Sequence, residues 1–235
     1  MAGWMEERKE DRLMKAVTSN EIVSDRLYNG ILGGVVVYGI AMNAMLCAIL
    51  GDRMLYVNPI ILIVGYVVCC IAGILLSSKS DNAVISFIGY NLVAVPLGLV
   101  LSITIYAYGG LQSQVVVQAF IITALITGFM IAFSIAKPEW FESIGGLLFG
   151  CLGGLVIAEL VMLILGINQL ITSWIGAALF SFYIGYDFYK AQQYPKTVDN
   201  AVDSALDIYL DVINLFIRIL RILGSRGGSS SRSRR

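Results

Sequence analysis

Long apolar segments separated by short polar breaks make up most of this chain. One break is the run SSKSDN at residues 77–82, and another is YPK at residues 194–196. The apolar segments reach roughly 20 residues, the length that an α-helix needs to cross a bilayer. The pattern therefore predicts seven transmembrane helices, at residues 28–50, 55–76, 83–108, 115–136, 143–165, 170–192 and 201–223.

The last of these helices differs from the others because it is amphipathic. At about 100° per residue, six of its polar side chains fall within a sector about 80° wide, and the remaining face is apolar. The six are Asp203, Asp207, Asp211, Asn214, Arg218 and Arg221. Ionisable groups are costly in lipid and usually face the interior of a bundle. We therefore predict an all-α, polytopic seven-helix bundle with the last helix at its centre.

The polar breaks are too short to be linkers, so the seven spans are expected to form one transmembrane domain, residues 28–223. A polar tail, residues 1–27, precedes it, and an Arg/Ser/Gly-rich tail, residues 224–235, follows. The mixed charge of the first tail shows no sign of a cleavable signal peptide. In the fifth span, closely spaced small residues such as Gly145, Gly146 and Gly150 predict tight packing between helices.

Composition supports a membrane protein and excludes several other classes. Hydrophobic residues make up 58% and charged residues 14% of the chain, whereas soluble domains carry about a quarter charged residues. The balanced net charge gives no support for nucleic-acid binding. The absence of histidine argues against a zinc site, and the four cysteines lie in apolar spans as expected of packing residues. No cofactor is predicted, and any bound metal would be calcium or magnesium on oxygen ligands.

Lysine and arginine counts indicate the orientation, because cytoplasmic loops carry an excess of both. Loops on the side of the N-terminus hold Lys79, Lys137, Lys190 and Lys196, whereas the opposite loops hold only Arg53. This predicts a cytoplasmic N-terminus in a cell (plasma or inner) membrane. Seven full crossings would place the Arg-rich C-terminal tail outside, against the rule. Either the Arg-rich tail is tolerated on the outer side, or one of the seven helices does not fully cross the membrane.

Acidic residues on the last two spans are the candidate site. Counted from a turn at Pro195, Asp187 lies roughly 9 Å and Asp211 roughly 16 Å from the helix ends, at 1.5 Å per residue. This hairpin geometry pairs Asp187 better with Asp207 than with Asp211. Asp199 and Asp203 lie nearer the turn and are expected to be solvated at the membrane surface.

Glu159, in the middle of the fifth span, is a second buried acid. It either packs against Arg218 or Arg221 or belongs to the same ion path as the aspartates. Paired intramembrane aspartates would also suit an aspartyl protease, but those enzymes typically carry GxGD, and here Asp187 stands in IGYD. No Ser–His–Asp triad and no phosphate-binding loop is present. We therefore do not expect an enzyme.

Two stretches resemble the Bax inhibitor-1 (transmembrane Bax inhibitor motif) family. IGYD at residues 184–187, followed by YLDVINLF at residues 209–216, is similar to that family's C-terminal signature, and SFIGYNLVAVPLGLVL at residues 86–101 is similar to its third span. The resemblance covers nearly the whole chain. It implies six helices around a central last one and a pH-responsive calcium leak in a bacterial homologue.

The resemblance also assigns roles to residues. It implies that Asp187 and Asp211 form an aspartate pair that senses pH and can bind calcium. The resemblance therefore favours Asp211 as the partner of Asp187, whereas the hairpin geometry favours Asp207. Family members can carry a basic residue in the second helix that latches onto these aspartates. Residues 55–78 here carry no charge. Any latch must come from elsewhere, such as Arg218 or Arg221, while Asp207, Glu159 and Asn214 are candidates for the ion path.

Three functions compete at this point. The first is a calcium leak channel gated by protonation of the aspartate pair. The second is a regulatory protein that binds other membrane proteins, such as a protease or cell-death and stress factors. The third, a proton-coupled transporter, would be favoured by inverted repeats, and the two halves of this chain show no convincing similarity. The expected partners are therefore the lipid bilayer, calcium ions and other membrane proteins.

Overall fold

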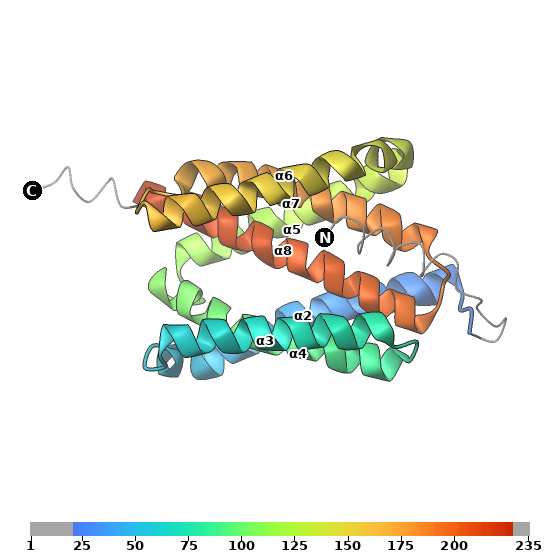
Figure 1. The fold of residues 1–235 in the computed structure, drawn as a ribbon, viewed down its shortest axis with the longest axis horizontal. Coiled ribbons are helices and arrows are strands. Elements are labelled where there is room, and N and C mark those ends of the chain that lie inside the picture. The colour runs from blue at the N-terminus through green and yellow to red at the C-terminus, as the bar shows by residue number, and fades with distance from the viewer. Residues whose placement is uncertain (1–20, 228–235) are drawn as a thin grey trace, which may run out of the picture. The chain divides into compact units, whose positions relative to one another are not determined.

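The computed structural model describes residues 21–227 (Figure 1). Within them the chain folds entirely into helices: α2 (Asp25–Met54), α3 (Pro59–Lys79), α4 (Ala83–Ala107), α5 (Gln114–Ala136), α6 (Pro138–Ile164), α7 (Leu170–Gln193) and α8 (Val198–Gly227). The predicted all-α fold with seven helices is confirmed for this part of the chain. Residues 1–20 of the predicted N-terminal tail and residues 228–235 of the C-terminal tail lie outside the described residues.

Five helices are long and apolar enough to cross a membrane. Their apolar stretches are Asp25–Leu50, Ile60–Ser77, Ala83–Ala107, Gln114–Ala136 and Pro138–Ile164. With 24 and 30 residues, α7 and α8 are long enough to cross a bilayer, but neither contains a stretch as continuously apolar as those five. The protein therefore has several membrane spans, and seven complete crossings remain a prediction.

Polar side chains start the helices near the predicted breaks. The side-chain oxygens of Ser24 and Asn82 accept hydrogen bonds from first-turn backbone N–H groups of α2 and α4, which otherwise lack partners. The largest difference from prediction is at α6, which was expected from residue 143 and begins at Pro138. Proline is favoured in the first helical turn because its missing N–H group is not needed there. Pro138 therefore starts the helix instead of separating two helices.

Contacts divide the chain into two compact units. The first comprises Met1–Leu111 and Lys190–Tyr209, and the second comprises Gln112–Tyr189 and Leu210–Arg235. The first unit therefore contains α2, α3, α4 and the beginning of α8. The second contains α5, α6, most of α7 and the remainder of α8. The prediction of one transmembrane domain stays a prediction.

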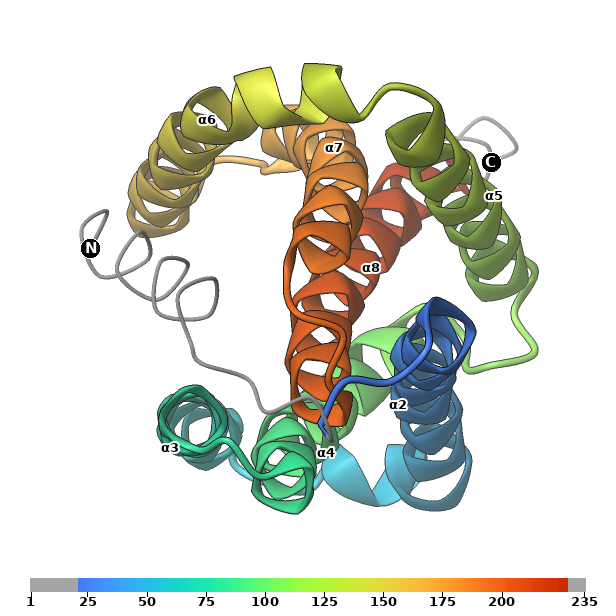
Figure 2. The ribbon, with the colours of Figure 1, turned by 90° about the vertical axis from the view of Figure 1, so that its right-hand side faces the viewer.

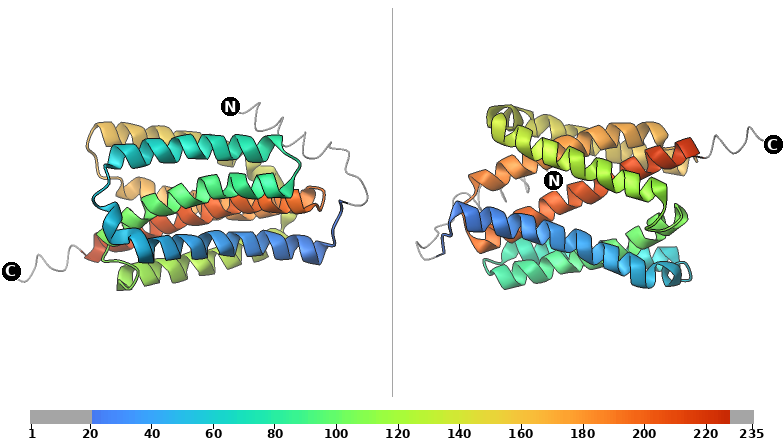
Figure 3. Two further views of the ribbon diagram at one scale, coloured as in Figure 1. Left: turned by 90° about the horizontal axis from the view of Figure 1, so that it is seen from below. Right: turned by 180° about the vertical axis from the view of Figure 1, so that it is seen from behind.

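In the first unit, α4 lies between α2 and α3 (Figures 2 and 3). The backbones of α3 and α4 touch where two glycines meet. A Cβ atom at Gly73 would lie 2.5 Å from the carbonyl oxygen of Gly89, and one at Gly89 would lie 2.7 Å from that of Gly73. No residue larger than glycine fits such a contact, so α3 and α4 approach as closely as small residues allow.

In the second unit, α7 packs against both α5 and α6. A Cβ atom at Gly185 would lie 2.4 Å from the Phe141 ring and 3.2 Å from the carbonyl oxygen of Met130. Gly145 on α6 lies equally close to the ring of Tyr186. The other glycines predicted to pack tightly in this span do not: a Cβ atom at Gly146, Gly150, Gly153 or Gly154 would meet nothing within 4 Å. That prediction was wrong because these four lie on the exposed side of α6.

Candidate functional site

Asp187 on α7 and Asp211 on α8 are both buried. They are 8% and 7% exposed, and one oxygen of each carboxylate is shut off from solvent. Both residues belong to the second unit. Asp207, in contrast, is only partly buried and belongs to the first unit. Asp187 and Asp211 therefore share both their burial and their unit, whereas Asp207 shares neither with Asp187.

Position along the helices favours Asp207 instead of Asp211 as the partner of Asp187. At 1.5 Å per residue, Asp187 lies about 9 Å from the end of α7, whereas Asp207 and Asp211 lie about 14 and 20 Å from the start of α8. Helix rise alone therefore brings Asp207 nearer to the level of Asp187. The pairing of Asp187 with Asp211 remains a prediction.

Most of α8 is buried, and its less buried positions form a line. From residue 200 to residue 222, all side chains are buried except those of Asp207, Leu210, Asn214, Ile217 and Arg221. These positions recur every three or four residues, so they lie along one side of the helix. Two of them, Asp207 and Asn214, were candidates for the ion path, and Arg221 was a candidate latch. Among these, Asn214 donates through Nδ2 to the carbonyl oxygen of Leu210, 2.8 Å away on its own helix.

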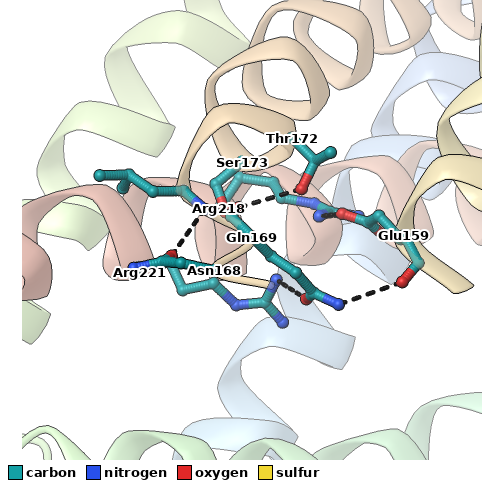
Figure 4. Close-up of polar contacts among 8 residues, drawn as sticks. Glu159, Asn168, Gln169, Thr172, Ser173, Arg218 and Arg221 are labelled. Carbon is teal, nitrogen blue, oxygen red and sulfur yellow. Dashed lines mark hydrogen bonds and ion pairs between the residues drawn. The ribbon is translucent and has the colours of Figure 1, made fainter. Parts of the chain in front are cut away.

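Glu159 on α6 pairs with Arg218 on α8. Nη1 of the arginine bonds to Oε1 of the carboxylate, and Nη2 donates to Oε2 at 2.8 Å (Figure 4). Of the alternatives open for Glu159, the structure shows the one in which it packs against Arg218. Arg218, a candidate latch for the aspartates, is therefore engaged by a carboxylate on a different helix.

Gln169, in the turn before α7, links this ion pair to the second arginine. Its Oε1 accepts from Nη1 of Arg221 at 3.2 Å, and its Nε2 donates to the backbone oxygen of Glu159 at 3.2 Å (Figure 4). Its carbonyl oxygen also accepts from the hydroxyls of Thr172 and Ser173. Sequence reasoning missed Gln169, although its place just before a predicted helix is where capping groups occur.

Two acidic residues expected in solvent are held inside the first unit. Asp203 is 6% exposed, and its Oδ1 accepts a hydrogen bond from the hydroxyl of Ser77 on α3. Asp199 is partly buried and accepts from the hydroxyl of Ser86 on α4 at 2.6 Å. The prediction of solvation was wrong for Asp203, because it considered only the turn next to this residue along the chain, whereas Asp199 keeps part of its surface exposed. The two serines were also missed, since nothing in their local sequence points to α8.

The turn between α7 and α8 is itself fixed. The Lys196 amine donates to the carbonyl oxygen of Gln192 at 2.9 Å and lies 4.5 Å from the centre of the Tyr28 ring. Tyr28 in turn donates through its hydroxyl to the carbonyl oxygen of Ala191 at 2.8 Å. Burial lowers the pKa of the Lys196 amine, although the nearby charge of Asp25 acts in the opposite direction. The turn is thus tied to the start of α2.

No three cysteine, aspartate or glutamate side chains within residues 21–227 gather closely enough to hold a metal ion. The four cysteines are free, and of these only Cys47 is buried. Cys47 therefore fits the predicted packing role, whereas the exposed Cys151 does not.

Comparisons with known proteins agree with this architecture. The sequence model of the family described as inhibitor of apoptosis-promoting Bax1 matches residues 23–228. An uncharacterised protein of Helicobacter pylori is 34% identical over 110 residues, so the chain spans about half the length of this relative, 46% of each protein. The inner membrane protein YbhL of Escherichia coli is 27% identical over 188 residues, 74% of this chain and 79% of YbhL.

A eukaryotic relative is also found. Bax inhibitor 1 of Schizosaccharomyces pombe is 30% identical over 116 residues, which are 48% of this chain and 43% of the yeast protein. The family match extends over nearly all of the described helices, including the five that are apolar enough to span a membrane. This chain therefore belongs to the Bax inhibitor family and is a multi-pass membrane protein.

Proposed function

We propose that this protein is a calcium leak channel whose ion passage responds to pH through Asp187 and Asp211. One observation carries the proposal: two carboxylates, those of Asp187 and Asp211, are buried in the same unit of a membrane protein. Ionisable groups inside membrane bundles usually mark ion paths, proton relays or gates. The family resemblance of the sequence around both residues supports the same assignment.

The chemistry of an aspartate pair explains how pH would act. Two carboxylates close together in a low-dielectric interior cannot both ionise cheaply, so at low pH the pair holds a shared proton that links the two helices. At higher pH both are charged, repel each other and offer oxygen ligands to a divalent cation. Protonation therefore changes both the contact between α7 and α8 and the affinity for calcium.

Three further parts belong to this proposal. The last helix is the central one, which the burial of nearly all of its side chains supports. The ion path follows the less buried side of α8, past Asp207 and Asn214. The N-terminus is cytoplasmic, in a cell membrane like that of the Escherichia coli relative, which is named as an inner membrane protein.

The proposal is tested by calcium flux into liposomes that contain only this protein, measured over a range of pH. The wild-type protein is expected to pass calcium in a pH-dependent manner. Asp187→Asn and Asp211→Asn should each flatten the pH response, because neither variant can form a pair that shares a proton. Asp52→Asn is the matched control, since Asp52 is exposed, and it should keep the wild-type profile.

An additional variant decides between the two possible partners of Asp187. If Asp207→Asn flattens the response and Asp211→Asn does not, the pair is Asp187 with Asp207. If all three asparagine variants keep the wild-type profile, the aspartate sensor is rejected. Asp203→Asn is unsuitable as a control because Asp203 is buried against Ser77.

A second candidate function is regulation through binding of other membrane proteins, such as a protease or cell-death and stress factors. The observation that favours it is the name of the yeast relative, Bax inhibitor 1. The same liposomes separate the two candidates, because a protein that acts only through partners will not pass calcium by itself. Absence of flux at every pH would therefore reject the channel and favour this alternative.

A further inference from the structure

An ion pair in the second unit joins two helices that are far apart in the sequence. Glu159 on α6 and Arg218 on α8 form two parallel charge-assisted hydrogen bonds. Their side chains are 20% and 10% exposed. A bidentate pair fixes the orientation of its partners as well as their distance. It therefore restricts how α8 can lie against α6.

Arg218 reaches α6 by passing α7 at a glycine. A Cβ atom at Gly176 would lie 3.0 Å from Nε and 3.2 Å from Cδ of Arg218, so the arginine rests on the backbone of α7. One turn further along α7, the centre of the Phe180 ring lies 5.8 Å from Cζ of Arg218. This distance suits a cation–π interaction. The arginine thus joins three helices at one level.

A second link lies one turn further along α8. Arg221 donates to the side chain of Gln169, which also donates to the backbone of Glu159 (Figure 4). The two arginines differ in what they meet: Arg218 pairs with a carboxylate, whereas Arg221 bonds to a neutral amide. This difference provides a charge-matched comparison on the same helix.

We propose that Glu159 and Arg218 form a charge-balanced clamp that holds the C-terminal part of α8 in one register against α6 and α7. The hydrophobic effect does not drive helices together in lipid, because the lipid tails are as apolar as the side chains, so the register depends on close packing and on polar contacts such as this ion pair. A slide of one turn moves a helix by about 5.4 Å, which would separate the arginine from both Glu159 and Gly176. The ion pair therefore penalises every register except one.

The clamp does not include the proposed sensor, but Asp211 lies on α8 two turns before Arg218, so the register of α8 sets the level of Asp211 along α7. This consequence for ion passage rests on the proposed function. The clamp itself does not, because it is defined by contacts among Glu159, Gly176 and Arg218. Glu159 and Arg218 are thus positioning residues for the aspartates.

The first test is a double-mutant cycle on the purified full-length protein in detergent. Glu159→Gln and Arg218→Gln should each lower the melting temperature by about 10 °C, because each leaves one buried charge without its partner. The double variant Glu159→Gln/Arg218→Gln should melt closer to the wild type than either single variant does. Arg218→Lys should be intermediate, since lysine keeps the charge but loses the bidentate geometry.

Two controls are matched to these variants. Glu139→Gln removes an exposed carboxylate from the first turn of the same helix, α6. Arg221→Gln removes a positive charge one turn from Arg218. Both should lower the melting temperature by less than about 3 °C. Additive losses in the double variant, or a loss from Arg221→Gln as large as that from Arg218→Gln, would overturn the clamp. If the single variants do not fold, a folded double variant supports it and an unfolded one rejects it.

The second test connects the clamp to ion passage. In the liposome assay, the single variants should shift the pH profile of calcium flux, and the double variant should restore it towards the wild type. If the melting temperatures show coupling between Glu159 and Arg218 but the flux profiles do not change, the clamp is supported and its effect on the aspartates is rejected. Absence of wild-type flux would reject the proposed channel, whereas the melting cycle would still decide on the clamp.

Discussion

The buried acids of this protein meet donors of different strength. Asp203 accepts a hydrogen bond from the neutral hydroxyl of Ser77, whereas Glu159 pairs with the guanidinium of Arg218. The arginine is a charged donor and forms two parallel hydrogen bonds to Glu159, whereas the serine is a neutral donor and forms one to Asp203. Loss of the serine hydroxyl should therefore cost less than loss of the arginine, but more than loss of an exposed hydroxyl.

Ser77→Ala measures this difference. It removes a donor from a buried carboxylate and should lower the free energy of unfolding by about 1–3 kcal/mol. Ser143→Ala is the control, since the Ser143 hydroxyl is exposed and donates to the carbonyl oxygen of Trp140 on its own helix. It should change the free energy of unfolding by less than about 0.5 kcal/mol. Equal effects in denaturant titrations would show that the bond between Ser77 and Asp203 does not stabilise the fold.

At this scale, sequence reasoning identified the chemistry but not all of the contacts. The polar stripe of the last helix and the isolation of Glu159 among apolar residues singled out Glu159 and Arg218 as possible partners. The pairing remained open because 59 residues separate them. Asp203 was misplaced because its donor lies 126 residues earlier in the chain. Contacts of this range depend on how helices pack, which local patterns do not encode.

At the scale of helices, several of the closest contacts occur at glycines. The backbones of α3 and α4 meet at Gly73 and Gly89, and α7 meets its neighbours at Gly176 and Gly185. The sequence predicted the helices well because polar breaks and capping residues are local signals. It did not predict which glycines make contacts, since an exposed glycine and a packed one look alike along the chain.

Gly89→Ala tests the contact between α3 and α4. The added methyl group would lie 2.7 Å from the carbonyl oxygen of Gly73, so the helices must separate. We expect a loss of about 1–3 kcal/mol in the free energy of unfolding. Gly65→Ala, on α3, is the matched control because nothing lies within 4 Å of its Cβ position. It should be neutral or stabilising by up to about 1 kcal/mol. A similar loss in both variants would contradict a special role for the glycine contact.

For the molecule as a whole, the main open feature is its orientation in the membrane. The bias of Lys79, Lys137, Lys190 and Lys196 against Arg53 predicts that the loop between α3 and α4 is cytoplasmic. Lys196 also has a structural role in the turn between α7 and α8. Lys196 therefore contributes to the fold of this turn as well as to the charge bias that predicts the orientation.

Reporter fusions test this orientation. Alkaline phosphatase, which is active only outside the cytoplasm, should be active when fused after Asp52 and inactive when fused after Ser80. A fluorescent protein that folds only in the cytoplasm should give the opposite pattern, because the predicted orientation puts the two loops on opposite sides of the membrane. Phosphatase activity after Ser80 would reverse the proposed orientation.

The pair of Glu159 and Arg218 also has a consequence for biosynthesis. A ribosome makes α6 before α8, so the carboxylate of Glu159 is present when Arg218 emerges 59 residues later. An arginine at the centre of a membrane helix opposes insertion by about 3 kcal/mol. Because α8 is also less apolar than the five helices able to span alone, we expect the earlier carboxylate to lower the cost of placing Arg218 in the membrane. On this expectation the order of the helices in the gene is also an order of assembly.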